Sequence, residues 1–257
     1  MKTHPDEFRI SISALECDVT SRRRKPVAPD LGIAPFRNRN LGSDIYCIGA
    51  GGSLNYLDRT FFDDKIVVAV NEIASRWGVH ADYGICKEEG TLLEIAPLGY
   101  PIMASRHDSG YHAHPPRSMA SYPQFPNLTI FEHEDNRAEA FDAYAHWPTD
   151  PNALLVSMST ITTGMHFAAH LGARFIFVVG HDCGQLGETD YVTGYTAPVG
   201  EWKEPWLVAI EKQSLAVKRE LLRRYAPTLR GIYSVSPFLS PNLDGVPYRG
   251  ANRINLW

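Results

Sequence analysis

Residues 159–195 place a helix start, a buried strand and a polar loop in direct succession. Residues 160–164 carry threonine hydroxyls and a glycine, and residues 165–172 continue as a small-residue helix that stops at a glycine. Residues 175–180 are an apolar run that ends in polar side chains. In open α/β sheets, ligands bind at helix N-termini and at the carboxyl ends of strands. The segment has one of each, so it predicts an α/β fold with a ligand site at one edge of a sheet.

Other apolar runs extend this pattern over most of the chain. Short, uniformly apolar runs that alternate with helical segments indicate parallel strands covered on both faces. The predicted strands are 44–48, 65–70, 81–86, 100–104, 128–131, 175–180 and 231–235, and the predicted helices include 72–77, 137–144, 165–172 and 206–225. We therefore predict a Rossmann-like α/β fold with a mostly parallel sheet, helices on both faces and a lid loop.

The predicted strands begin at Asp44, so residues 44–257 are expected to form a single domain. Residues 1–43 hold prolines among arginines and are interpreted as an N-terminal arm or linker, with a short edge strand at 10–15. Residues 184–205 form a polar segment with several aromatic side chains, and its length is typical of a lid.

Composition narrows the class of protein. The net charge is −4, so the chain has no overall basic field for nucleic acid, and a basic cluster at 22–25 fits a solvated linker better than a binding patch. The four cysteines show no CxxC spacing, and Cys47 and Cys86 lie in apolar runs as expected for reduced core residues. No apolar run approaches the ~20 residues that span a bilayer. With no signal-peptide core at the N-terminus, these features predict a cytoplasmic protein.

A glycine-rich loop follows the first predicted strand. Gly49, Gly51, Gly52 and Ser53 leave the backbone N–H groups free of bulky side chains, which suits phosphate binding at a helix start. The same residues also fit a tight strand-to-helix turn. The loop is neither a GxGxxG nor a Walker A sequence, because Leu54 follows it and no GK[ST] is present.

Two further polar groups stand at strand or helix ends. Asn71 directly follows the second predicted strand, where an amide can bind a nucleoside or cap the strand. Thr162, Thr163 and Gly164 stand at the start of the predicted helix, where the hydroxyls can cap the helix or contact a nucleotide. Both positions are candidates for nucleotide binding.

Asp182 ends the strand at 175–180 and can act as a base, bind acceptor hydroxyls or organise the loop. Its neighbour His181 is a second candidate catalytic residue. Two histidine pairs, His166 with His170 and His112 with His114, have spacings that allow metal binding. The first pair lacks the glutamate of a zincin motif and fits polar packing better, and the second fits a solvated loop. We therefore expect no metal site.

The order of these motifs resembles that of the bacterial sialyltransferases of glycosyltransferase family 42. It runs from G-x-G-x-S-L after a strand, through V-N, D-Y and I-T-T-G, to G-x-D after an apolar strand. It is also similar to Rossmann-like domains of unknown-function family 115, which include flagellin-glycosylation factors and a hydroxymethylpterin diphosphokinase. The resemblance covers about residues 44–225.

The resemblance implies a Rossmann-like nucleotide-binding transferase domain. It implies that the glycine-rich loop, Asn71 and the threonines surround a nucleotide, and that Tyr191 and Tyr195 on the lid contact the leaving phosphate without a metal. The chain departs from the sialyltransferases in having Ala50 in the first loop, Gly184 after G-x-D, and no histidine beyond His181. Alternatives for the general base are Asp182, Asp190, His181 and Glu201.

These features favour a metal-independent glycosyltransferase that uses a CMP-, UDP- or GDP-linked sugar and a glycan or small-molecule acceptor. No permanently bound cofactor is expected, and a homo-oligomer is compatible with the sequence. The alternatives are a diphosphokinase-type transferase acting on a pterin-like substrate and a non-catalytic nucleotide- or glycan-binding module. A nucleic-acid acceptor, as in glycosylation of DNA bases, is a minor variant that the acidic net charge disfavours.

Overall fold

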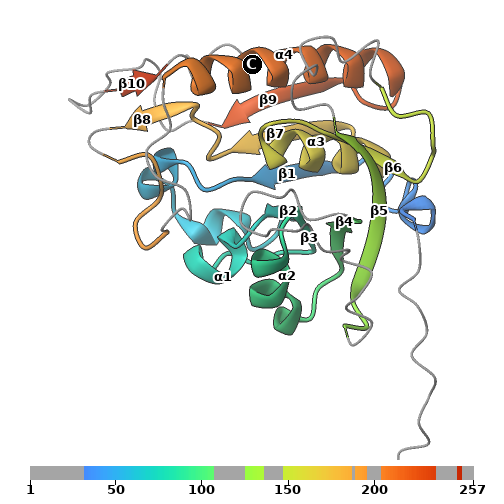
Figure 1. The fold of residues 1–257 in the computed structure, drawn as a ribbon, viewed down its shortest axis with the longest axis horizontal. Helices are drawn as coiled ribbons and strands as arrows, with labels where there is room; N and C mark the ends of the chain where they lie inside the picture. The colour runs from blue at the N-terminus through green and yellow to red at the C-terminus, as the bar shows by residue number, and fades with distance from the viewer. Residues whose placement is uncertain are drawn as a thin grey trace, which may run out of the picture.

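The computed structural model describes residues 32–106, 125–135, 147–186, 189–195, 204–235 and 248–250. Within these ranges, one sheet contains eight strands in the order β6-β5-β4-β3-β2-β1-β7-β9, and all neighbours are parallel (Figure 1). The strands are β1 Asp44–Ile48, β2 Ile66–Val70, β3 Tyr83–Cys86, β4 Ile102–Ser105, β5 Leu128–Asp135, β6 Ala153–Val156, β7 Phe175–Val179 and β9 Gly231–Val235. The predicted parallel sheet is confirmed.

Helices cover both faces of the sheet. The α-helices are α1 Ile73–Trp77, α2 Glu89–Ile95, α3 Thr160–His170 and α4 Glu204–Arg224, and the short 3-10 helices are η1 Ala34–Phe36, η2 Gly52–Tyr56, η3 Arg59–Phe62 and η4 Ala96–Leu98. Side chains alternate along β1, so that Ile45 and Cys47 join the core cluster of α3 and α4, whereas Tyr46 and Ile48 join that of α1. The core residues of α2 pack on the same side as α1, against β3, β4 and β5.

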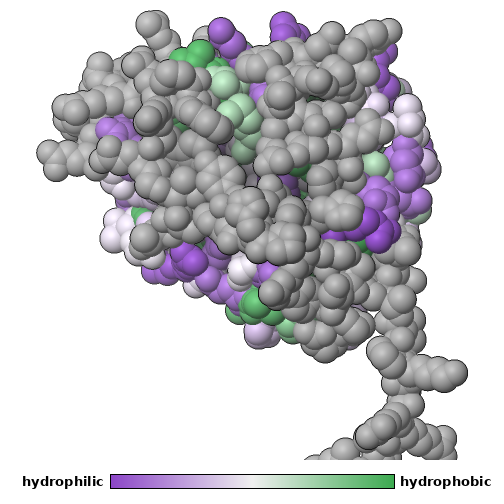
Figure 2. Space-filling view, in the orientation of Figure 1, coloured by the Kyte–Doolittle hydropathy of each residue, from purple (hydrophilic) through white to green (hydrophobic). Residues whose placement is uncertain are grey.

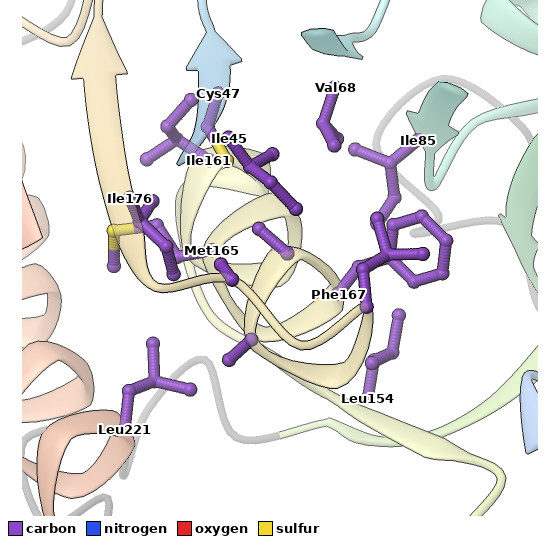
Figure 3. Packing of buried hydrophobic residues seen from close by; sticks show 14 of the residues in the cluster. Ile45, Cys47, Val68, Ile85, Leu154, Ile161, Met165, Phe167, Ile176 and Leu221 are labelled. Atoms are coloured by element: carbon purple, nitrogen blue, oxygen red, sulfur yellow. The ribbon is translucent and has the colours of Figure 1, made fainter. Parts of the chain in front are cut away.

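The central helix α3 has almost no solvent-exposed face. All of its residues from Ile161 to His170 are buried, and Figure 3 shows Ile161, Met165 and Phe167 among side chains from the strands. Gly164 faces the sheet closely, because a Cβ atom added there would lie 3.2 Å from Val70 Cγ2. Burial of each large apolar side chain, such as Ile161, Met165 or Phe167, contributes roughly 1.5–3 kcal/mol to the stability of the fold. Although α3 is rich in small residues, these side chains fix it to the sheet.

Several elements differ from the prediction. The strand β6 and the helix α2 were not predicted, since four apolar residues after a turn and a seven-residue helix are too short for a periodic signal. The strand β5 runs four residues beyond the predicted end, through polar residues paired with β6. A separate antiparallel pair joins β8 Gly184–Leu186 to β10 Tyr248–Gly250.

Part of the predicted N-terminal arm packs against the domain. Ile33 and Phe36 are members of the larger core cluster, and the Gly32 N–H donates to Ile130 O at 2.8 Å. The predicted strand at 10–15, the predicted helix at 137–144 and the basic cluster at 22–25 lie outside the described residues.

The surface carries scattered apolar side chains. Figure 2 shows a hydrophobic area over α2, where Leu93 is 45% exposed, and Leu98 of the adjoining η4 is 47% exposed. Across the described ranges, every helix is too short or too polar to cross a bilayer.

Gly180→Ala is expected to destabilise the protein more than Gly99→Ala. Both glycines have positive φ, +63° and +84°, so each substitution costs roughly 1–2 kcal/mol for the left-handed backbone. Only at Gly180 does the added Cβ meet backbone, at 2.6 Å from Gly49 O, which adds about 1–3 kcal/mol of overpacking. Urea unfolding of both variants measures the difference, and equal losses would contradict the close contact.

Candidate functional site

The strand order reverses between β1 and β7. Strands β1 to β6 follow one another toward one edge of the sheet, and the chain then returns through α3 to place β7 on the other side of β1. In open α/β sheets, ligands bind outside the carboxyl ends of the two strands at such a reversal. The glycine-rich loop follows β1 and Asp182 follows β7, so both predicted segments lie at this position.

The two loops touch through their backbones. A Cβ atom added to Gly49 would lie 2.7 Å from Gly180 O, and one added to Gly180 would lie 2.6 Å from Gly49 O. The same Cβ position at Gly49 is 3.6 Å from Ile161 Cδ1, in the first turn of α3. The structure therefore brings the glycine-rich loop, the β7 loop and the start of α3 together, although they are far apart in the sequence.

Much of the glycine-rich loop is hydrogen-bonded to its neighbours. The N–H groups of Gly49 and Gly51 donate to Val179 O and Gly180 O, both at 2.8 Å, and the Ser53 N–H donates to Asp182 Oδ2 at 2.7 Å. The helix that follows is the five-residue 3-10 helix η2, so its dipole is small. The glycines are thus needed for close packing of the loops, and their contact with a phosphate stays a prediction.

Asp182 is a buried carboxylic acid at the centre of this contact. Its side chain is 5% exposed, and its carboxylate oxygen Oδ2 would lie 2.6 Å from a Cβ atom at Gly51. Burial raises the pKa of Asp182 to about 6, and the hydrogen bonds from Ser53 oppose part of that rise. A carboxyl group with this pKa can hold or release a proton near neutral pH.

Residues 189–195, which we call the lid segment, lie on the glycine-rich loop. Gly51 forms an antiparallel bridge with Tyr191, and the Val192 N–H donates to Ala50 O at 2.9 Å. The Cβ position of Gly52 is 3.2 Å from Thr189 O. Figure 1 draws the lid segment in orange beside the blue η2. The lid segment therefore covers the loop at which the phosphate is predicted to bind.

The second lid tyrosine binds an acid that was not predicted. The Tyr195 hydroxyl donates to Glu72 Oε2 at 2.8 Å, and its ring centroid lies 5.4 Å from that of Tyr191. Glu72 follows β2 and is 6% exposed. Its neighbour Asn71 has a positive φ of 55° and donates its N–H to Ile85 O. An acid after the second strand is a known signal in dinucleotide-binding folds, and it could have drawn attention to Glu72.

Thr162 and Thr163 in the first turn of α3 are fully buried. The Thr162 hydroxyl donates to Ser159 O at 2.7 Å and lies 2.6 Å from the Ser157 hydroxyl, so it already has partners within its own chain segment. The Thr163 hydroxyl is buried without a hydrogen-bond partner among the described residues. Buried hydroxyls usually have partners, so this one could bond to a ligand or a water. The Ser53 side chain is also buried, and it helps to lower the pKa of Asp182.

The His181 side chain contacts α4. Its Nε2 atom is 3.0 Å from the Ser214 hydroxyl and 3.5 Å from Cys183 Sγ. Burial lowers the pKa of His181 to about 4, so the ring is neutral at neutral pH. Cys183 has a positive φ of 52°, which costs energy for a non-glycine residue. This strained turn follows Asp182 directly.

The histidine pair on α3 has structural partners. His166 Nδ1 accepts the Leu155 N–H at 2.9 Å, and its Nε2 lies 2.9 Å from the Tyr225 hydroxyl. His170 Nε2 lies 2.9 Å from Ile33 O. Burial lowers the pKa of His166 to about 3. No set of three or more potential metal ligands occurs in the ranges given above, and His112 and His114 lie outside them.

A buried lysine near the start of α3 was also missed. Lys87 directly follows β3, is 4% exposed and donates to Ser157 O at 2.9 Å. Its sequence context, a lysine followed by two glutamates, is that of an exposed charged turn, so only the fold reveals the burial.

No family model and no curated protein matches the sequence. The chain is similar to a solved point variant of the sialyltransferase Cst-II in complex with CMP, at 15% identity over 76% of this chain and 82% of that one, with a TM-score of 0.43. It is similar to the monofunctional alpha-2,3-sialyltransferase Cst-I from Campylobacter jejuni, at 16% identity over 77% of each chain and a TM-score of 0.43. Cst-II from Campylobacter jejuni with the substrate analogue CMP-3FNeuAc gives 15% identity over 83% and 93%, with the same TM-score. Similarity this low does not place the chain in a family, so its function has to be inferred from the site.

Asp182→Asn is expected to change how stability depends on pH. Because the folded pKa of about 6 exceeds the ordinary 3.8, the folded state binds more protons than the unfolded state between those values. Asp182 therefore lowers the free energy of unfolding as the pH rises from about 4 to 6, by at most about 3 kcal/mol. The free energy of unfolding of both proteins is measured with urea at pH 4 and pH 7. Relative to the wild type, the variant should be more stable at pH 7 than at pH 4.

Asp58→Asn is the matched control with the opposite sign. The Asp58 carboxylate accepts the Thr60 N–H at 3.0 Å, and this bond lowers its pKa. Its contribution to stability is present above the unfolded pKa and is lost as the pH falls. A shift of the same sign in both variants would show that the change at Asp182 is not due to its burial.

Proposed function

We propose that this protein is a metal-independent glycosyltransferase that uses a nucleotide-activated sugar. The observation that carries the proposal is the buried Asp182 carboxyl, which has a pKa of about 6 and lies where the loops after β1 and β7 meet. A base with a pKa near the working pH is suited to accept a proton from a hydroxyl group. Carboxyl groups with shifted pKa values are concentrated at functional sites. Ligands of open α/β sheets bind where the strand order reverses, which is where Asp182 lies.

In the proposed reaction, the acceptor hydroxyl oxygen attacks the anomeric carbon of the donor sugar. The bond from that carbon to the phosphate oxygen breaks, and its electron pair leaves with the nucleotide. The hydroxyl proton passes to the Asp182 carboxylate. The Tyr191 hydroxyl donates a hydrogen bond to the leaving phosphate, which stabilises its negative charge without a metal ion.

The nucleotide would bind between the glycine-rich loop and α3. The Thr163 hydroxyl on α3 is buried and has no partner among the described residues, so a ligand with hydroxyl or phosphate oxygens would satisfy it. Ser53 on the glycine-rich loop is buried and bonded to Asp182. We assign Gly51 and Gly52 to the phosphate or ribose and Asn71 to the nucleoside. Ligand entry would require the lid segment to move, because it covers the glycine-rich loop.

Tyr191→Phe is expected to lower the rate of sugar transfer or donor hydrolysis about 10²-fold, with little change in nucleotide affinity, because it removes one hydrogen bond to the developing charge. The donor is first identified with a panel of CMP-, UDP- and GDP-linked sugars, by turnover and by the rise in melting temperature that a bound nucleotide causes. Tyr233→Phe on β9, which is 45% exposed, is the control and should keep the full rate.

The panel also separates the alternatives. A rise in melting temperature with ATP that requires Mg²⁺ would support the diphosphokinase-type transferase. Binding of a nucleotide sugar without turnover would support a non-catalytic module. If no member of the panel binds or reacts, the proposed glycosyltransferase is wrong.

A further inference from the structure

The buried side chain of Glu72 is bonded to the lid segment. Glu72 is 6% exposed, and both of its oxygens have partners, since Oε2 accepts the Tyr195 hydroxyl at 2.8 Å and Oε1 accepts the Thr91 hydroxyl at 2.5 Å. Thr91 lies on α2 and is 2% exposed. Glu72 therefore links the lid segment to α2.

The Tyr195 ring is also held through its face. The Arg76 guanidinium lies 5.1 Å from the ring centroid, within the range of a cation–π contact. Arg76 is itself fixed by Glu94, through bonds of 3.0 Å from Nε and 2.8 Å from Nη2. The side chain of Tyr195 is thus held at its hydroxyl by Glu72, the residue before α1, and at its ring by Arg76 of α1, and residues of α2 fix both partners.

From Tyr195 the contacts lead to the glycine-rich loop. The Tyr195 N–H donates to Val192 O at 3.0 Å, and the Val192 N–H donates to Ala50 O at 2.9 Å. The Tyr195 ring packs at 5.4 Å against Tyr191, which pairs with Gly51. The position of Tyr191 therefore depends on the attachment of Tyr195.

We propose that Glu72 is a positioning residue, which latches the lid segment through Tyr195 and so holds Tyr191 over the glycine-rich loop. Tyr195 then acts as the attachment point of the lid, and Tyr191 keeps the contact with the leaving phosphate that the proposed function gives it. The latch is a property of the fold, and only its effect on turnover rests on the proposed function. Breaking the Tyr195–Glu72 bond removes one of the attachments of the lid segment and makes its opening from the loop easier, although the Val192–Ala50 and Thr193–Asn55 bonds remain.

Tyr195→Phe tests the latch by amide hydrogen exchange. Removing the hydroxyl breaks the bond to Glu72 and leaves that buried carboxylate short of a partner, so the amides of Val192 and Tyr195 should exchange at least tenfold faster. Tyr83→Phe is the matched control, because the Tyr83 hydroxyl makes a bond of the same length, 2.8 Å to Asn40 Oδ1, on the other face of the sheet. It should leave exchange in the lid segment unchanged.

Glu72→Gln weakens the same bond from its other side, and its own rise in lid-segment exchange over the wild type tests the latch even if Tyr195→Phe does not fold. The neutral amide oxygen still accepts the Tyr195 hydroxyl but more weakly, so exchange in the lid segment should rise by less than in Tyr195→Phe. In the Glu72→Gln background, Tyr195→Phe should then have a smaller effect than in the wild type, as expected for two residues that act through one bond. Additive effects would contradict the latch.

The consequence for turnover is measured with the donor found in the panel. Tyr195→Phe should lower kcat roughly tenfold more than Tyr83→Phe does, because Tyr191 is no longer held in place. If the lid segment of Tyr195→Phe exchanges its amides as slowly as in the wild type, the proposal is wrong. It is also wrong if Tyr83→Phe raises lid-segment exchange as much as Tyr195→Phe does. If no nucleotide sugar reacts, the proposed function fails while the exchange measurement still decides whether the latch exists.

Discussion

The contact between the loops after β1 and β7 is the constraint on which the candidate site depends. Gly49 and Gly180 approach so closely that neither position has room for a Cβ atom, and Gly180 also needs a left-handed backbone. This approach carries Asp182 to the Ser53 N–H, 2.7 Å away, although the two residues are 129 positions apart. Without two glycines at this point, the loops would separate and the carboxyl group would be hydrated.

Two buried acids then have different tasks. Asp182 holds the two loops together, and its burial raises its pKa toward neutrality, which suits proton transfer. Glu72 accepts hydroxyl hydrogens from Thr91 and Tyr195 and holds the lid segment. Each acid is kept in the interior by donors that offset the cost of burying charge. In the proposed transferase, Asp182 would be the reactive group and Glu72 would hold the cover that excludes water.

Much of the fold could be predicted because its strands are uniformly apolar and punctuated by glycine. The strands β1, β7 and β9 begin at the predicted residues, α4 begins two residues before the predicted 206–225, and α3 begins five residues before the predicted 165–172. The misses are short or polar: β6 has four residues, and β5 continues through Glu132 and beyond. Among the site residues, the sequence indicated Asp182 and the lid tyrosines, and it missed Glu72 and Lys87 because their burial depends on neighbours distant in the sequence.

By itself, the sequence determined the parallel α/β architecture, the positions of the glycines and the polar residues at the strand ends, because these follow from local periodicity and backbone conformation. Only the tertiary structure decided which of these groups already have hydrogen-bond partners within the protein. The Thr162 hydroxyl is bonded to Ser159 O, the Ser53 N–H is bonded to Asp182, and Tyr195 is bonded to Glu72 across 123 residues. The physical reason is that such partners are set by the order of the strands, which no local pattern encodes.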